Sequence, residues 1–79
     1  MKLNEAVAKR IAELCKQHHL TQYGLSQKSG VPQSTLSTIM NCRFPGMKMQ
    51  IIYEICEGLE MTLKEFYDSP LFDRENIVD

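Results

Sequence analysis

Five polar, uncharged side chains fall on one side of residues 33–41 if that segment is helical. Positions i, i+1, i+4, i+5 and i+8 share a helix face, and here they hold Gln33, Ser34, Ser37, Thr38 and Asn41. Amide and hydroxyl groups both donate and accept hydrogen bonds, and a glutamine can form two of them with an adenine. This is the chemistry that recognises base edges in DNA, and we expect the first four side chains to contact bases.

A polar face is informative only if neighbouring elements hold it at a fixed angle, because the exposed side of most helices is simply solvated. Two short helices, 22–29 and 33–40, are predicted on either side of a tight turn. Such a crossing requires a small residue where the helices approach and a turn residue that tolerates positive φ, for which the sequence offers Ser26 and Gly30. The apolar residues expected to lock the angle are Leu25, Val31, Leu36 and Ile39.

These residue types at this spacing resemble the helix-turn-helix of the Xre family, the phage Cro and lambda repressor type. The resemblance covers residues 4–70, with the motif at about 22–41. The matching residues are Leu20-Thr21-Gln22, Leu25-Ser26, the run from Ser29 to Ser37, Ile39 and Asn41. The resemblance implies a sequence-specific transcriptional regulator that binds operator DNA through a recognition helix at 33–41.

The resemblance also implies phosphate contacts on both sides of the recognition helix. Gln22 opens the preceding helix, where free backbone N–H groups favour an anion. Asn41 matches the family's phosphate-contacting asparagine, and Arg43 adds a positive charge just beyond it. The chain departs from the family at Cys42, where glycine is common. Either Asn41 takes the left-handed conformation or the helix ends differently.

Three further helices complete the prediction, at about residues 4–18, 47–58 and, after a Thr62 cap, 63–67. Asn4 is the expected N-cap of the first helix, whose solvent side should carry Lys9, Arg10 and Lys16. The predicted fold class is all-α, a compact bundle of five short helices like the lambda repressor DNA-binding domain. Residues 1–70 form this domain, and residues 71–79 are a tail that either helps a dimer to form or is flexible.

Length and composition argue against catalysis. A chain of 79 residues offers little scaffold for a deep enzyme cleft, and no catalytic or metal-ligating set is apparent. Three cysteines at wide spacing predict neither a zinc site nor a disulfide framework. We therefore expect no cofactor, no membrane segment and no small-molecule effector, and a cytoplasmic location.

The net charge of −1 conceals a division along the chain. Residues 1–50 carry seven Lys and Arg against two Glu, a net of +5, whereas residues 51–79 carry two against eight, a net of −6. This division is typical of a protein that turns one face to a polyanion and keeps the other away from it. Double-stranded DNA is the expected partner.

A single helix-turn-helix covers little DNA, so a homodimer on a two-fold symmetric site is expected. Its interface is predicted at four apolar residues that exceed what so small a core can bury, namely Phe66, Tyr67, Leu71 and Phe72. The alternative is that these side chains cap the fourth helix. A different functional class also remains open: an antitoxin-like module of a toxin–antitoxin pair, whose acidic half docks a basic protein.

Overall fold

Apolar residues with helical periodicity produce five α-helices, joined by short loops and followed by two 3₁₀ turns. The computed structural model describes all 79 residues and contains no strand. The elements are α1 (Leu3–Gln17), α2 (Gln22–Ser29), α3 (Gln33–Met40), α4 (Met49–Gly58), α5 (Leu63–Tyr67), η1 (Pro70–Phe72) and η2 (Arg74–Asn76). The predicted all-α class and the five helices are confirmed.

One hydrophobic core receives side chains from all five helices. Its twelve residues are at most 4% exposed: Val7, Ile11, Leu14, Leu25, Val31, Leu36, Ile39, Ile52, Ile55, Cys56, Leu59 and Phe66. The four residues expected to lock the helix-turn-helix are among them, which confirms that prediction. Since burying one such side chain contributes about 1.5–3 kcal/mol, the core fixes the orientation of α3.

The start of α1 differs from the prediction that Asn4 is its N-cap. The helix begins at Leu3, and the N-cap is Lys2, whose backbone N–H donates to the Glu5 carboxylate at 2.7 Å. Because the helix already includes position 4, the Ala6 N–H that an Asn4 cap would bond donates instead to the Lys2 carbonyl at 3.1 Å. Asn4 instead donates from Nδ2 to the Cys42 carbonyl at 3.2 Å, which links α1 to the residue after Asn41.

Arg10 also departs from its predicted place on the solvent side of α1. Its Nε donates to the Phe66 carbonyl at 2.7 Å and its Nη2 to the Glu65 carbonyl at 2.9 Å. A helix of five residues leaves its last carbonyl groups without intrahelical donors, and the guanidinium supplies them. The ion pair with Glu13, at 3.4 Å, lies at the edge of this contact. Arg10 therefore fastens α5 to α1.

The four apolar residues assigned to a dimer interface do not share one environment. Phe66 is 0% exposed and belongs to the core, so a second copy cannot reach it, and its assignment was wrong. Its ring lies 5.0 Å from that of Tyr67 and 6.1 Å from that of Phe72, which is half-buried like Leu71. For Phe66 the alternative holds, because α5 turns this ring inward. Tyr67 keeps 42% of its surface exposed.

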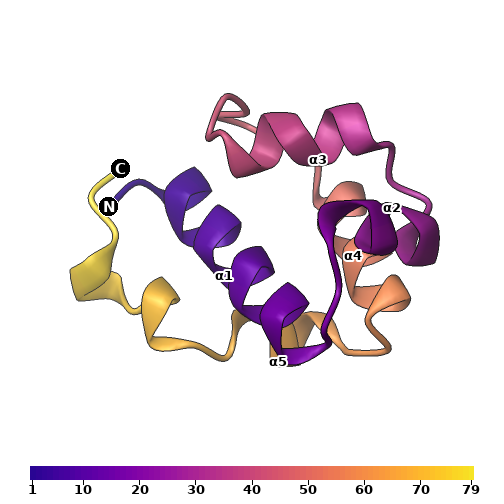
Figure 1. Cartoon of the computed structure of the whole chain (residues 1–79). Coiled ribbons are helices and arrows are strands. Elements are labelled where there is room, and N and C mark those ends of the chain that lie inside the picture. The colour runs from indigo at the N-terminus through magenta and orange to yellow at the C-terminus, as the bar shows by residue number, and fades with distance from the viewer.

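Residues 71–79 fold back onto the start of the chain, so that the two chain ends lie side by side (Figure 1). The Met1 amine donates to the Asn76 carbonyl at 2.8 Å, and the Val78 N–H donates to the Met1 carbonyl at 2.9 Å. The Leu3 N–H donates to the Asp79 carboxylate at 2.8 Å. A negative charge at this point also interacts favourably with the dipole of α1.

Candidate nucleic-acid interface

The turn between α2 and α3 is held by its own polar groups. Gly30 adopts φ +78°, and its N–H donates to the Ser26 carbonyl at 2.9 Å. The Ser26 hydroxyl donates to the Val31 carbonyl at 2.7 Å, and the Ser29 hydroxyl donates to the Leu25 carbonyl at 2.7 Å. Ser26 therefore contributes a hydrogen bond across the turn in addition to its predicted small size.

A close backbone contact from α4 supports this turn, at a residue that sequence reasoning missed. A Cβ atom on Gly58 would lie 2.7 Å from Ser29 Cα and 2.9 Å from the Lys28 carbonyl carbon. Only glycine fits this crossing of α4 over the end of α2. Gly58 looks like a helix stop in the sequence, but the left-handed residue that ends α4 is Glu60, at φ 56°. The available signal in the sequence was a glycine two residues before the left-handed position, where it is not needed to end the helix.

The recognition-helix candidate α3 lies along one edge of the molecule, beside α2 (Figure 1). Gln33 and Ser34 are exposed at its start, and Ser37 and Thr38 are half-buried one turn later. Gln22 Nε2 lies 3.4 Å from the Gln33 carbonyl oxygen, so the first residues of α2 and α3 meet. The structure thus brings one expected phosphate contact next to one expected base contact.

The start of α3 presents backbone donors as well as side chains. Pro32 precedes the helix with φ −59° and provides no side-chain cap. The N–H groups of Gln33, Ser34 and Thr35 consequently have no partner within the protein. Free N–H groups at a helix start carry partial positive charge and favour an acceptor or an anion. Gln33 therefore offers its amide side chain and its own N–H from the same point.

Two polar side chains farther along α3 hydrogen-bond to their own helix. Thr38 Oγ1 donates to the Ser34 carbonyl at 2.9 Å, so its hydroxyl oxygen remains free to accept from a base. Asn41 Nδ2 donates to the Ser37 carbonyl at 2.8 Å and lies 3.4 Å from the Ser37 hydroxyl. The Nδ2 group of Asn41 carries two hydrogens, and one of them is used in the bond to the Ser37 carbonyl. Only the other can reach a phosphate, whose oxygens accept hydrogen bonds and do not donate them.

The structure shows how α3 ends although Cys42 replaces the glycine that is common in the family at this position. Cys42 itself takes the left-handed conformation, at φ 55°, while Asn41 has φ −90°. The Cys42 N–H donates to the Ile39 carbonyl and the Arg43 N–H to the Thr38 carbonyl, each at 3.0 Å. This is the hydrogen-bond pattern of a Schellman motif, in which glycine usually occupies the left-handed position. Arg43 follows the motif and is exposed, with no ion pair.

Replacing Cys42 with glycine should stabilise the protein by about 0.5–1 kcal/mol. A side chain in the left-handed region costs about 1–2 kcal/mol, and the greater flexibility of glycine in the unfolded chain offsets part of the gain. The Asn4 hydrogen bond should survive because it uses the Cys42 backbone carbonyl. Urea unfolding of C42G and the parent chain measures the difference.

Glu60→Gly is the matched control for Cys42→Gly. Glu60 has φ 56° at the end of α4, outside the α2–α3 unit, and should give a gain of similar size. A loss of stability in C42G beside a gain in E60G would show that the Cys42 side chain stabilises this helix end.

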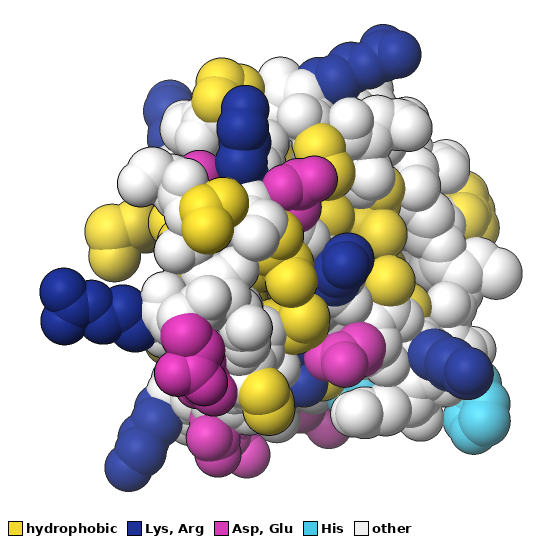
Figure 2. Space-filling view, turned by 90° about the vertical axis from the view of Figure 1, so that its left-hand side faces the viewer, with side chains coloured by type: hydrophobic (Ala, Val, Ile, Leu, Met, Phe, Trp, Pro, Cys, Tyr) yellow, Lys and Arg dark blue, Asp and Glu magenta, His cyan; other side chains and the backbone are white.

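Charge on the molecule is less separated in space than along the chain. Figure 2 shows Lys and Arg side chains interleaved with Asp and Glu on the face that carries the chain ends, with hydrophobic side chains exposed among them. Asp79, one of the acidic residues of 51–79, lies at the start of α1, where its carboxylate accepts from the Leu3 N–H. The division into a basic and an acidic half therefore does not hold on this face.

Outside the helix-turn-helix, we considered the cysteine thiols, possible metal ligands and possible membrane-spanning helices. Burial raises the pKa of the Cys15 and Cys56 thiols, whereas Cys42 is exposed. No three His, Cys, Asp or Glu side chains are grouped so that they could hold a metal ion. None of the helices is long and apolar enough to cross a membrane.

Comparison with known families decides what this helix-turn-helix is. Residues 10–70 match the model of the Cro/C1-type HTH DNA-binding domain, which is more than half of the chain. The chain belongs to this family. No curated protein and no solved structure matched the sequence. The Cro/C1-type match extends from the middle of α1 to the start of η1, and it confirms the resemblance to the Xre family. The protein therefore carries a DNA-binding domain.

Proposed function

We propose that this protein is a transcriptional regulator that recognises a specific operator sequence through α3. The observation that carries the proposal is the start of α3, where the exposed Gln33 and Ser34 side chains accompany unpaired backbone N–H groups. In a helix-turn-helix, the first residues of the second helix contact base edges in the major groove. The Cro/C1-type match provides the DNA-binding context for this geometry.

Each polar group of the interface has a distinct proposed role. Gln33 pairs with an adenine through both amide atoms, and Ser34 hydrogen-bonds a neighbouring base. Ser37 contacts the next base, and Thr38, whose hydrogen is used within α3, accepts from the amino group of an adenine or a cytosine. The phosphate contacts come from the side chains that flank α3: Gln22, Asn41 and Arg43.

Gln33→Ala should remove discrimination at one base position. Loss of a bidentate amide–adenine pair costs about 2 kcal/mol, or about thirtyfold in affinity for the preferred duplex. Binding to a duplex with that base pair replaced should change little, because the variant no longer distinguishes the two. The measurement is fluorescence anisotropy on a site selected from genomic fragments, with a scrambled duplex as reference.

Arg43→Ala is the contrasting variant. Arg43 is exposed and has no ion pair, so its loss should weaken binding to every duplex by a similar factor and lower the salt slope by about one. Equal parent affinity for selected and scrambled duplexes would contradict sequence-specific binding. An unchanged preference in Q33A would contradict the role of Gln33 alone.

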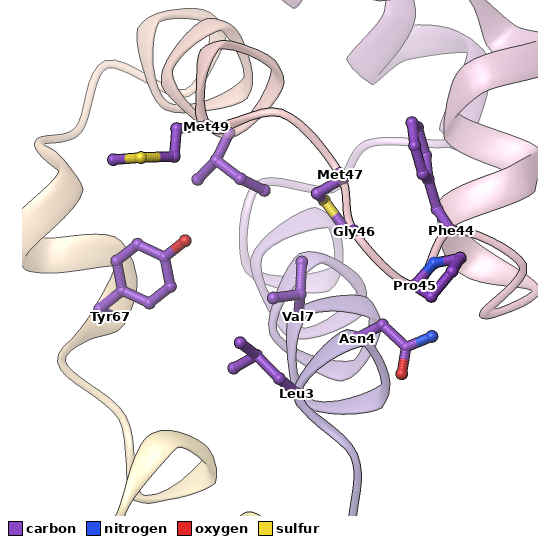
Figure 3. Close-up of a pocket in the computed structure, with 10 residues that line it drawn as sticks. Leu3, Asn4, Val7, Phe44, Pro45, Gly46, Met47, Met49 and Tyr67 are labelled. Carbon is purple, nitrogen blue, oxygen red and sulfur yellow. The ribbon is translucent and has the colours of Figure 1, made fainter. Parts of the chain in front are cut away.

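The proposed regulator acts as a homodimer, and an apolar patch between the start of α1, the start of α4 and the end of α5 provides the contact. Leu3, Met49 and Tyr67 are 47%, 82% and 42% exposed, and they converge around a pocket of about 190 Å³ (Figure 3). The loop from Phe44 to Met47, which follows α3, forms another wall of this pocket. A second copy seated here places its own α3 on the same DNA, as a two-fold symmetric operator requires.

Met49→Glu should abolish self-association while leaving the fold intact. Met49 is the most exposed large apolar side chain, and a carboxylate buried against Leu3 and Tyr67 of a second copy would lack a partner. The dissociation constant of the dimer should rise more than about tenfold, as measured by sedimentation equilibrium. Leu63→Glu, on an exposed residue of α5 that does not line the pocket, should have no such effect. A monomeric parent chain, or equal effects of both variants, would contradict the assignment.

A further inference from the structure

A second pocket, open to solvent on one side, lies behind the recognition helix between α1, α2 and α3. Its volume is about 310 Å³, and seven of its nine lining residues are hydrophobic. Ala12 and Cys15 line it from α1, and Leu36 and Met40 from the inward side of α3. The size is at the lower end for small-molecule sites, which begin at about 300 Å³, and is too small for a helix or strand of a partner protein.

The polar groups at this pocket are a cation and an amide. Lys16 and Gln22 are the two lining residues that are not hydrophobic, and both are exposed. Lys16 forms no ion pair within the protein, since the ion pair of Arg10 with Glu13 is the only one present. An apolar cavity with an unpaired ammonium and an amide donor at its edge matches a small apolar molecule that carries a negative charge at one end.

We propose that the pocket between α1, α2 and α3 binds a small apolar carboxylate, with its hydrocarbon part against Ala12, Leu20 and Met40 and its carboxylate at Lys16 and Gln22. A medium-chain fatty acid of about eight carbons is the matching class, because its chain fills an apolar pocket of this size and its single charge meets the single cation. This proposal departs from the expectation from sequence that the chain has no small-molecule effector.

Ligand occupancy is coupled to DNA binding in this arrangement, a step that rests on the proposed function. Gln22 is both a wall of the pocket and the proposed phosphate contact at the start of α2. A carboxylate held by Gln22 and Lys16 occupies the position and the hydrogen-bond donors that a DNA phosphate requires. The two anions therefore compete, and by thermodynamic linkage each lowers the affinity of the other by the same factor.

The first experiment tests the site without DNA. Amide chemical shifts of the ¹⁵N-labelled full chain are followed during titration with octanoate, with octan-1-ol as an uncharged control. Shifts should concentrate at the pocket residues, and Ala12→Leu, which fills the pocket from an exposed helix position, should weaken octanoate binding more than about tenfold. Gln17→Leu, an exposed α1 position outside the pocket, should bind octanoate like the parent.

Lys16→Gln tests the charge and does not depend on the folding of A12L. It should weaken octanoate about fivefold and leave octanol unchanged, whereas Lys64→Gln on α5 should change neither. Equal octanoate affinity in the parent and A12L would overturn the site. Octanol binding as tight as octanoate, or no effect of K16Q, would overturn the carboxylate assignment.

The second experiment tests the coupling by anisotropy on operator DNA. Octanoate should raise the dissociation constant of the parent and Q17L, but not that of A12L. A parent that binds octanoate but no specific DNA would refute the proposed function and leave the site intact. Unchanged operator affinity at saturating octanoate would overturn the coupling.

Discussion

Gly58→Ala should destabilise the protein by about 3 kcal/mol, which is a large share of the 5–15 kcal/mol typical of a domain. The added Cβ would lie under 3.0 Å from Ser29 Cα, Ser29 N and the Lys28 carbonyl carbon. All three are backbone atoms, so no side-chain rotation can relieve the contact. The helices α4 and α2 must move apart instead.

That separation would also reach the DNA-binding surface. Ser29 is the last residue of α2, and its hydroxyl hydrogen-bonds across the turn that leads to α3. Displacing Ser29 shifts the turn and with it the angle at which α3 is presented. We expect G58A to lower DNA affinity even under conditions in which the variant is still fully folded. Urea unfolding and DNA anisotropy measure the two effects separately.

Gly24→Ala is the matched control for Gly58→Ala. A Cβ on Gly24 would meet Leu20 Cδ2 at 3.2 Å, which is the end of a side chain that can rotate. Alanine also favours the helix by about 1 kcal/mol over glycine, so G24A should be neutral or slightly stabilising. Equal destabilisation by both substitutions would show that helix packing near Ser29 is not the cause.

Arg10→Met should destabilise the protein by about 2 kcal/mol. The part-buried hydrogen bond from Arg10 to the Phe66 carbonyl contributes about 1.5–3 kcal/mol. The exposed one to the Glu65 carbonyl adds little, because that carbonyl also accepts from the Asp68 N–H at 3.3 Å. Methionine retains packing of the aliphatic stem, so the loss reports mainly on these hydrogen bonds. The free energy of unfolding, measured in urea, is the relevant quantity.

Lys9→Met controls for the lost charge. Lys9 is exposed beside Arg10 and forms no ion pair, so its replacement should change stability by less than about 0.5 kcal/mol. Arg10→Lys should recover only part of the loss, since an ammonium cannot present the planar fork that reaches both carbonyls. Equal stability of R10M and K9M would rule out the proposed link between α1 and α5.

Features that depend on local pattern were predictable from the sequence. The spacing of Leu25, Val31, Leu36 and Ile39 identified the buried side of the helix-turn-helix, because period and burial are coupled in every helix. Gly30 was also identified from local pattern, because a left-handed turn favours glycine.

Features that depend on contacts between distant segments were not predictable. Arg10 looks like an exposed charge until the fold brings it to the last carbonyl groups of α5, 55 residues away along the chain. Gly58 looks like a helix stop until α4 meets α2. The orientation of the short helix α5 places Phe66 in the core, although composition alone suggested more apolar residues than the core could bury. In each case the deciding partner lies outside any local window.

The fixed position of Arg10 has a consequence for how the proposed regulator would locate its operator. Residues 1–50 contain seven Lys and Arg, but the Arg10 guanidinium is committed to α5. Retention on arbitrary chromosomal DNA depends on how many phosphates a protein neutralises. Arg10 keeps its charge but is not free to contact a phosphate, so each non-specific encounter of the proposed regulator would be briefer than the number of Lys and Arg in that segment suggests. Its search would then proceed through shorter sliding runs and more frequent returns to free solution.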